Sequence, residues 1–117
     1  MLKRFLPLLS AKRPPMSLMQ ALKEKDVLIV DVRTPQEVQA GGSCKGSMNV
    51  PLDAIPTKIS LLGDDHSRPI VFYCKKGIRA ANAAAFVSQM GFTNAFSATD
   101  GETVQKLLDD VEMNSPK

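Results

Sequence analysis

Two continuous apolar runs indicate strands that lie inside the protein. They are VLIVDV at 27–32 and IVFY at 70–73, and neither alternates between apolar and polar residues. Strands with one face in water alternate, whereas strands covered on both faces do not, and the second kind is typical of parallel sheets. The segments SMNVP at 47–51 and NAFSA at 94–98 are predicted as brief further strands.

Segments of helical character separate these strands. Ser17 is a predicted N-cap for a short helix in SLMQALKEK. Thr34, Pro35 and Glu37 form the N-cap, first and third positions of a helix that ends at Gly41-Gly42. The other predicted helices are 54–63, 78–90 and 101–111. Strand and helix alternate throughout, which predicts an α/β fold: a central parallel sheet of four to five strands with helices on both faces.

Proline and glycine set the limits of two of these helices. We expect 54–63 to be mostly helix, restarted after Pro56 and stopped by Gly63. We expect the helix at 78–90 to end with Gly91 as its C-cap. This second helix contains five alanines, so it is slim enough to approach a sheet closely.

The length of 117 residues and the apolar fraction of 44% predict one ordinary globular domain. We place it at 16–112, between a flexible basic tail at 1–15 and a short tail at 113–117. The first 14 residues hold four basic residues and no acid, whereas the rest holds 11 basic and 12 acidic residues. The body is therefore nearly neutral, which gives no support for nucleic-acid binding. No apolar run approaches the ~20 residues of a membrane span, and we expect a monomer.

The N-terminal stretch MLKRFLPLLSAKRP leaves alternatives open. Its positive start and short apolar part, interrupted by Pro7, faintly resemble a secretory signal, and an acid-free leader to an organelle is also conceivable. A frayed basic tail is the simpler interpretation. We expect a cytoplasmic protein, with export or organelle targeting through residues 1–15 as the alternative.

The segment VFYCKKGIRA places Cys74 where a buried strand ends and a helix is about to begin. The backbone N–H groups of the intervening residues can turn toward the sulfur, and the helix adds its positive N-terminal end. Gly77 permits a left-handed backbone, and Lys75, Lys76 and Arg79 add positive charge. All these features favour the thiolate, so the pattern predicts a nucleophile rather than a merely buried cysteine.

Several motifs in this order resemble the single-domain rhodanese family. They are DVR at 31–33 with TPQEVQAGG after it, KGSMNVPLDAI at 45–55, VFYCKKGIRAANAAAFVSQMGF at 71–92 and DGETV at 100–104. The resemblance covers about residues 16–110. It implies that Cys74 carries a sulfane sulfur as a persulfide. It also implies that Lys75, Lys76, Gly77, Ile78 and Arg79 form the anion-binding cradle around it.

This resemblance implies a thiosulfate sulfurtransferase that acts by double displacement. An anionic donor such as thiosulfate gives its outer sulfur to Cys74, and a thiol or cyanide acceptor then takes it, with a protein thiol among the candidate partners. No cofactor is expected. The alternative is a non-catalytic rhodanese-like module that binds another protein.

Two departures from the family pattern concern the surroundings of the site. A histidine and a proline are common where this chain has Ser43, Cys44 and Lys45. A pair of glycines near a tryptophan is common where it has Asp100-Gly101 and no tryptophan. The second departure is expected to change one wall of the crevice, and with it the choice of sulfur donor or acceptor.

Loop length separates two chemistries on this fold. Related cell-cycle phosphatases have one more residue between cysteine and arginine, whereas Cys74 and Arg79 enclose four residues. The smaller ring has room for an outer sulfur atom but is tight for a tetrahedral oxyanion, which favours sulfur transfer.

The supporting residues Asp31 and Arg33 end the first buried strand. Asp31 could orient Arg79 or loop amides, and Arg33 could face the crevice. We favour structural roles, with Arg33 paired to Glu37 one helical turn on. His66 is predicted to be a surface residue. With one histidine and two cysteines, the chain predicts no metal site and no disulfide scaffold.

Cys44 precedes its strand, whereas Cys74 ends its own. In a parallel sheet this placement puts Cys44 at or near the edge opposite to Cys74, more than ~10 Å away for a strand of four or five residues. A disulfide needs Cα atoms within about 7 Å. We therefore predict Cys44 to be a partly buried packing residue that takes no part in sulfur transfer.

Overall fold

The computed structural model describes residues 12–113, and within them it contains one four-stranded parallel sheet. The strands are β2 (Leu28–Asp31), β3 (Met48–Asn49), β4 (Ile70–Cys74) and β5 (Ala95–Asp100). Their order is β3-β2-β4-β5, and each neighbouring pair is parallel. The inner strands β2 and β4 are the two that the continuous apolar runs predicted, and the predicted fold class is confirmed.

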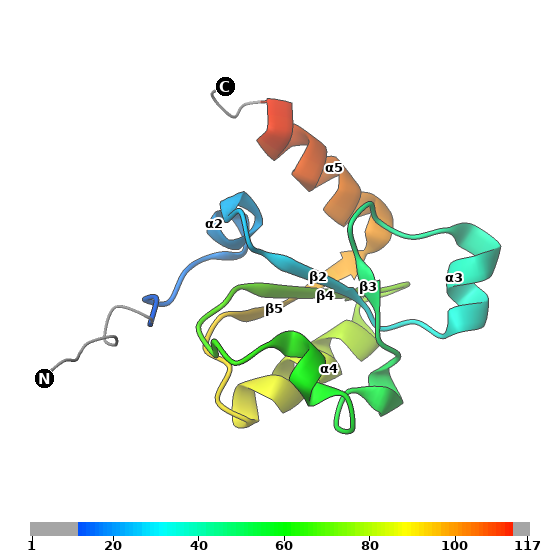
Figure 1. Cartoon of the computed structure of the whole chain (residues 1–117). Coiled ribbons are helices and arrows are strands. Elements are labelled where there is room, and N and C mark those ends of the chain that lie inside the picture. The colour runs from blue at the N-terminus through cyan, green and yellow to red at the C-terminus, as the bar shows by residue number, and fades with distance from the viewer. Residues whose placement is uncertain (1–11, 114–117) are drawn as a thin grey trace, which may run out of the picture.

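Helices cover both faces of the sheet. Within the described residues the α-helices are α2 (Leu18–Lys23), α3 (Pro35–Gly41), α4 (Ile78–Gln89) and α5 (Gly101–Met113). Figure 1 shows α2 and α5 on one face, α4 on the other, and α3 beside the strand ends. The predicted site at Cys74, the last residue of β4, therefore lies among α4, α3 and the start of α5.

Strand β4 contributes alternate side chains to two apolar layers. Phe72 and Cys74 pack toward α4, where Ala80 and Ala83 are fully buried. Small side chains bring α4 close to the sheet, as the alanine-rich sequence predicts. Tyr73 packs on the other face with residues of α2 and α5. Neighbouring Tyr73 and Cys74 thus point to opposite faces of one strand.

Helix starts follow the predicted capping chemistry. The Ser17 hydroxyl accepts a hydrogen bond from the Gln20 amide at 3.1 Å, and the Gln20 side chain binds back to the Ser17 amide. Thr34 and Glu37 form the same reciprocal pair at α3. Each pair satisfies two backbone donors that a helix start leaves open.

The predicted helix at 54–63 is wrong. The chain instead forms two short 3-10 turns, η1 (Leu52–Ala54) and η2 (Ile59–Leu62). Most backbone hydrogen bonds there connect residues three apart, as from the Gly63 amide to the Ser60 carbonyl at 3.1 Å, and a single bond from the Lys58 amide to the Ala54 carbonyl spans four. Pro56 lacks an amide hydrogen and cannot donate within an α-helical ladder, which explains the tighter and interrupted structure.

Part of the predicted basic tail contacts the domain. Arg13 forms an ion pair with Asp26, and the Pro14 carbonyl accepts a hydrogen bond from the Asn94 side chain at 3.3 Å. The targeting alternatives depend on residues 1–11, which lie outside the described residues. Among residues 12–113, no helix has the length and apolar character needed to cross a bilayer.

Candidate active site at the end of strand β4

Cys74 is the last residue of β4, and 2% of its surface is exposed. The Gly77 amide donates a hydrogen bond to Cys74 Sγ at 3.0 Å. Gly77 has a φ of 101°, a left-handed conformation that side-chain-bearing residues rarely adopt. A Cβ at this position would lie 3.5 Å from the Thr99 Cα, an ordinary van der Waals contact, so the constraint comes from the backbone conformation. The tight turn toward the sulfur therefore depends on glycine, as the sequence predicts.

Backbone amides control the ionisation of the Cys74 thiol. Burial alone raises its pKa, because a charged sulfur loses hydration. Hydrogen bonds from the backbone amides of Ala80, Gly77, Lys76 and Arg79 outweigh this effect and lower the pKa of Cys74 below its usual range. The loop and the first turn of α4 therefore stabilise the thiolate.

The side chains of the loop lie around this backbone cradle. Lys75 and Lys76 are exposed, and Ile78, the first residue of α4, has 72% of its surface exposed. The strongest causes that lower the pKa of Cys74 are backbone amides, and the Arg79 guanidinium and the Cys74 thiolate also attract each other. The lysines therefore form a positive rim that solvent reaches.

Arg79 has a different partner from the one considered in the sequence. Its guanidinium donates to Glu37 Oε1 at 2.7 Å and to Glu37 Oε2 at 3.0 Å. This ion pair, with the Thr34 amide, lowers the pKa of Glu37 to about 2. The suggestion that Asp31 orients Arg79 is therefore wrong. Glu37, which the sequence predicted to be a helix cap and a partner of Arg33, binds Arg79 instead.

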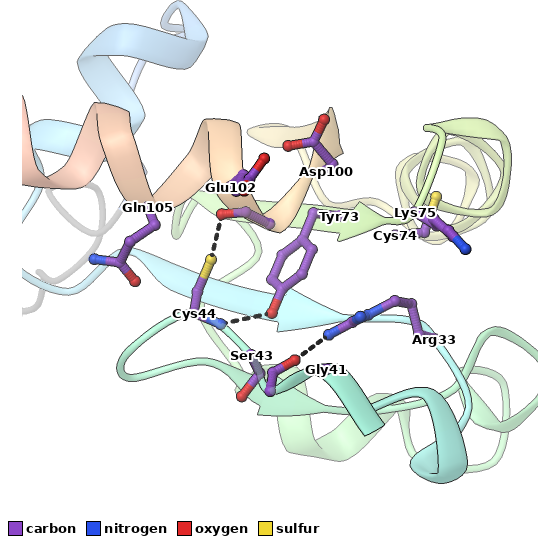
Figure 2. Close-up of a pocket in the computed structure, with 12 residues that line it drawn as sticks. Arg33, Gly41, Ser43, Cys44, Tyr73, Cys74, Lys75, Asp100, Glu102 and Gln105 are labelled. Carbon is purple, nitrogen blue, oxygen red and sulfur yellow. Dashed lines mark hydrogen bonds between the residues drawn. The ribbon is translucent and has the colours of Figure 1, made fainter. Parts of the chain in front are cut away.

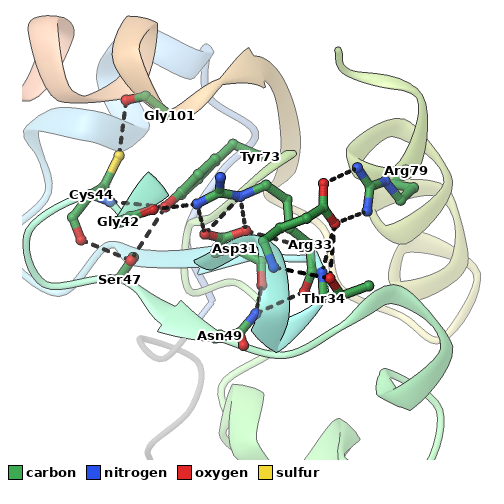
Figure 3. A network of polar contacts seen from close by, with 11 residues as sticks. Asp31, Arg33, Thr34, Gly42, Cys44, Ser47, Asn49, Tyr73, Arg79 and Gly101 are labelled. Carbon is green, nitrogen blue, oxygen red and sulfur yellow. Dashed lines mark hydrogen bonds and ion pairs between the residues drawn. The ribbon is translucent and has the colours of Figure 1, made fainter. Parts of the chain in front are cut away.

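Asp31 and Arg33 bind each other instead. Asp31 is fully buried and accepts from Arg33 Nη2 at 2.7 Å and from Arg33 Nε at 2.9 Å (Figure 3). Arg33 also donates to the Gly42 carbonyl at 2.6 Å. The predicted pairing of Arg33 with Glu37 is wrong, because the neighbouring buried carboxylate requires a cation and takes it. The pair ties the end of β2 to the end of α3.

A cavity of about 530 Å³ opens beside Cys74 (Figure 2). It is lined by 41–44 at and just after the end of α3, by 73–75 at the end of β4, by 100–102 where β5 meets α5, and by Arg33 and Gln105. The predicted Arg33, Cys74 and Lys75 thus come together at one cavity. The sequence did not identify Glu102 and Gln105 as residues of the site. It indicated this wall only through Asp100-Gly101, which departs from the family pattern.

Cys44 lines the same cavity, so its predicted place at the opposite edge of the sheet is wrong. Strand β3 has only two residues, and they pair with Val30 and Asp31 at the end of β2. The preceding loop therefore already lies near the edge where Cys74 is. In Figure 2 the Tyr73 ring lies between the two cysteines.

The surroundings of Cys44 favour the neutral thiol over the thiolate. It donates to the Gly101 carbonyl at 3.0 Å, and the Cys44 amide donates to the Tyr73 hydroxyl at 2.9 Å. Burial raises the pKa of Cys44 above its usual range. Its side chain is 5% exposed, and both cysteines are free thiols.

The amino-acid sequence is similar to those of a sulfurtransferase and a tRNA uridine(34) hydroxylase. A sulfurtransferase from Allochromatium vinosum is 36% identical over 86 residues, which are 73% of this chain and 78% of that protein. A tRNA uridine(34) hydroxylase from Hamiltonella defensa is 31% identical over 86 residues, but the chain spans only 24% of that protein's length.

Solved structures share the fold. A rhodanese with anions from E. coli has 26% sequence identity and a TM-score of 0.58, covering 65% of this chain and 88% of that one. A protein of unknown function from Rhodopseudomonas palustris, a possible tyrosine phosphatase, has 28% identity and a TM-score of 0.61, covering 70% and 67%. The family model of the rhodanese-like domain matches residues 15–103. The resemblance is thereby confirmed, and the chain belongs to the rhodanese-like domain family.

Proposed function

We propose that this protein is a sulfurtransferase that moves a sulfane sulfur from an anionic donor such as thiosulfate to a thiophilic acceptor. The observation that carries this proposal is the Cys74 thiol, whose pKa is lowered by four backbone amides although the side chain is buried. A thiolate held in this way is a nucleophile that needs no general base. The similarity to a sulfurtransferase over most of both chains supports the same activity.

The first half-reaction loads the cysteine. The Cys74 thiolate attacks the outer sulfur of thiosulfate, and a bond forms between Cys74 Sγ and that sulfur. The sulfur–sulfur bond of thiosulfate breaks, and sulfite leaves with its electron pair. Lys75 and Lys76 raise the local concentration of the dianionic donor from their exposed positions.

The second half-reaction unloads it. The acceptor attacks the outer sulfur, and the bond between that sulfur and Cys74 Sγ breaks. Sγ leaves as a thiolate, which the amides of Lys76, Gly77 and Arg79 stabilise again. The two steps need no oxidant or reductant, because the donor supplies the sulfane sulfur and the acceptor keeps it.

Two observations favour sulfur transfer over phosphate chemistry. The loop between Cys74 and Arg79 has four residues, and its amides converge on the sulfur atom itself. The Arg79 guanidinium is bound to Glu37 and is not directed at an oxyanion above the cysteine. A phosphate at Cys74 would require both features to change.

Intact-mass spectrometry after incubation with thiosulfate tests the proposal. The wild-type protein should gain the mass of one sulfur atom and lose it when cyanide is added, with thiocyanate released. The Cys74→Ser variant should gain nothing, whereas the Cys44→Ala variant should load like the wild type.

A wild-type protein that gains no sulfur from thiosulfate or from polysulfide would contradict the proposal. That outcome would favour the alternative function, a rhodanese-like module that binds a partner protein. Sulfur found on Cys44 by peptide mapping would contradict the assignment of Cys74.

A further inference from the structure

The cavity beside Cys74 is larger than the substrates that the proposed chemistry requires. Its volume of about 530 Å³ lies within the ~300–1,000 Å³ of small-molecule sites. One water molecule takes up about 30 Å³, so a diatomic cyanide ion or a thiosulfate ion fills only a small part. In Figure 2 Cys74 and Gln105 lie on opposite sides of the Tyr73 ring. The cavity thus continues well beyond the reacting sulfur.

Charge differs between the walls of this cavity. Lys75 lies next to Cys74, whereas Asp100 and Glu102 lie on the α5 side. Arg33 also lines the cavity, but the buried Asp31 carboxylate binds and neutralises its guanidinium. The α5 wall therefore presents negative charge close to a site that draws in an anionic donor.

The α5 wall has a fixed backbone and one acid, Glu102, that has no partner among residues 12–113. Asp100 accepts a hydrogen bond from the Thr103 amide at 2.7 Å and caps α5. A Cβ on Gly101 would lie 2.8 Å from Tyr73 Cε1, so this backbone packs directly on the ring. The Glu102 carboxylate forms no hydrogen bond or ion pair within residues 12–113. It is therefore available to a ligand in the cavity.

We propose that this cavity binds the sulfur acceptor, and that the acceptor is a low-molecular-weight thiol with a protonated amino group. The inference rests on the proposed function of Cys74. The acceptor's sulfur lies at Cys74, its body lies along Tyr73, and its ammonium group faces Glu102 and Asp100. An anionic donor is held by Lys75 instead, so the two substrates use differently charged parts of one cavity.

The transfer step is balanced without a further reactant. The acceptor thiolate attacks the outer sulfur of the Cys74 persulfide, and a new sulfur–sulfur bond joins the two. The bond to Cys74 Sγ breaks, and Sγ takes the electron pair and leaves as a thiolate. The product is the persulfide of the amino thiol.

Three small thiols of similar size test the charge preference. Cysteamine carries an ammonium group, 2-mercaptoethanol a hydroxyl and 3-mercaptopropionate a carboxylate. Protein loaded with sulfur on Cys74 is isolated and mixed with each thiol at low salt, and the loss of one sulfur atom is followed by mass spectrometry. Each variant is compared with the wild type for the same thiol, so differences in intrinsic thiol reactivity cancel.

The variants change one charge without changing the cap of α5. Glu102→Gln should slow transfer to cysteamine about three- to fivefold, the strength of an exposed ion pair, and should speed transfer to 3-mercaptopropionate. Transfer to 2-mercaptoethanol should change least. Glu102→Lys should slow transfer to cysteamine further and speed transfer to 3-mercaptopropionate further. Glu112→Gln and Glu112→Lys make the same charge changes near the far end of α5, outside the cavity, and should show neither effect.

Equal effects of Glu102→Gln on all three thiols would overturn the inference. So would the same pattern in the Glu112 variants, because the effect would then come from net charge. If thiosulfate fails to load Cys74, the proposed donor is wrong, and the thiol series is run on protein loaded with polysulfide. The acceptor inference therefore stands or falls separately from the donor.

Discussion

The two cysteines of this protein lie at one cavity but have opposite chemistry. Both are buried, with 2% of Cys74 and 5% of Cys44 exposed. At Cys74 backbone amides point their hydrogens at the sulfur and lower its pKa. At Cys44 the thiol donates to the Gly101 carbonyl, and burial raises its pKa. The direction of the surrounding peptide groups, rather than burial, therefore decides which sulfur is reactive.

The largest expected effect comes from removing each sulfur in turn. Cys74→Ser should reduce thiosulfate-to-cyanide transfer at least ~1,000-fold, because a serine cannot hold the sulfane sulfur. Cys44→Ala should retain most of the turnover, because its thiol is neutral and bound to a carbonyl. Thiocyanate formation measures both. If both variants lose activity while circular dichroism shows that both are folded, the two cysteines do not differ in the way described.

Alkylation compares the two thiols in a single protein. At pH 7 iodoacetamide should modify Cys74 more than about tenfold faster than Cys44, because only the thiolate reacts. Peptide mapping of partly alkylated protein gives both rates. In oxidised protein the same maps should contain no peptide linking Cys44 to Cys74. Equal rates, or a rate for Cys74 that rises only above pH ~8.5, would contradict the amide cradle.

Two glycine-to-alanine variants, Gly77→Ala and Gly46→Ala, separate the effect of backbone strain on stability from the effect of the loop on the pKa of Cys74. Gly77→Ala should destabilise the fold by about 1–2 kcal/mol, because alanine is disfavoured at a φ of 101°. It should also raise the pKa of Cys74, because the turn that aims the Gly77 amide relaxes. Urea unfolding and the pH dependence of alkylation measure the two effects.

Gly46→Ala is the matched control on the Cys44 side. Its φ is 81°, and a Cβ there meets nothing within 4 Å. A similar loss of stability is therefore expected, with no change in the pKa of Cys74. A Cys74 pKa that rises equally in both variants would mean that general destabilisation, rather than the loop geometry, alters the thiol.

The smallest expected effect concerns the ion pair beside the cradle. Glu37→Gln should release the Arg79 guanidinium and lower the KM for thiosulfate about two- to threefold at low salt. Initial rates over a range of donor concentrations measure this change, with Glu112→Gln as the control. A KM that does not move would show that Arg79 contributes only its backbone amide.

The effect of Glu37→Gln on the stability of the fold should depend on pH in the acid range. The pKa of Glu37 is about 2 in the fold and 4.5 in its absence, so its ion pair stabilises the fold fully above pH 4.5. That stabilisation is lost as the pH falls from about 4.5 toward 2. The stability difference between wild type and Glu37→Gln, followed by urea unfolding, should therefore shrink over this window. A constant difference would contradict the ion pair.

Local patterns predicted the fold and the cradle because the interactions behind them are short in sequence. The apolar runs identified β2 and β4, and Ser17 and Thr34 identified two helix starts. Likewise, the amides that bind Cys74 belong to the nearby Lys76, Gly77, Arg79 and Ala80. Such signals need no knowledge of how distant segments meet.

The remaining features depend on contacts that the sequence does not specify. Glu37 meets Arg79 across 42 positions, and no local pattern distinguishes it from an ordinary cap. The position of Cys44 follows from the shortness of β3, since a longer strand would carry it to the opposite edge. Its neighbours Tyr73 and Gly101 come from two other elements. These are tertiary facts, and only the structure supplies them.

Helix α3 has no buried residue, although it forms one wall of the cavity. It is attached through its ends, by the Glu37–Arg79 ion pair and by the Arg33 hydrogen bond to the Gly42 carbonyl. Little apolar surface resists its separation from the sheet, so α3 should unfold locally at much lower free energy than β2 and β4. Its amides should exchange with solvent deuterium, and its peptide bonds should be cut by proteases, while the sheet remains intact.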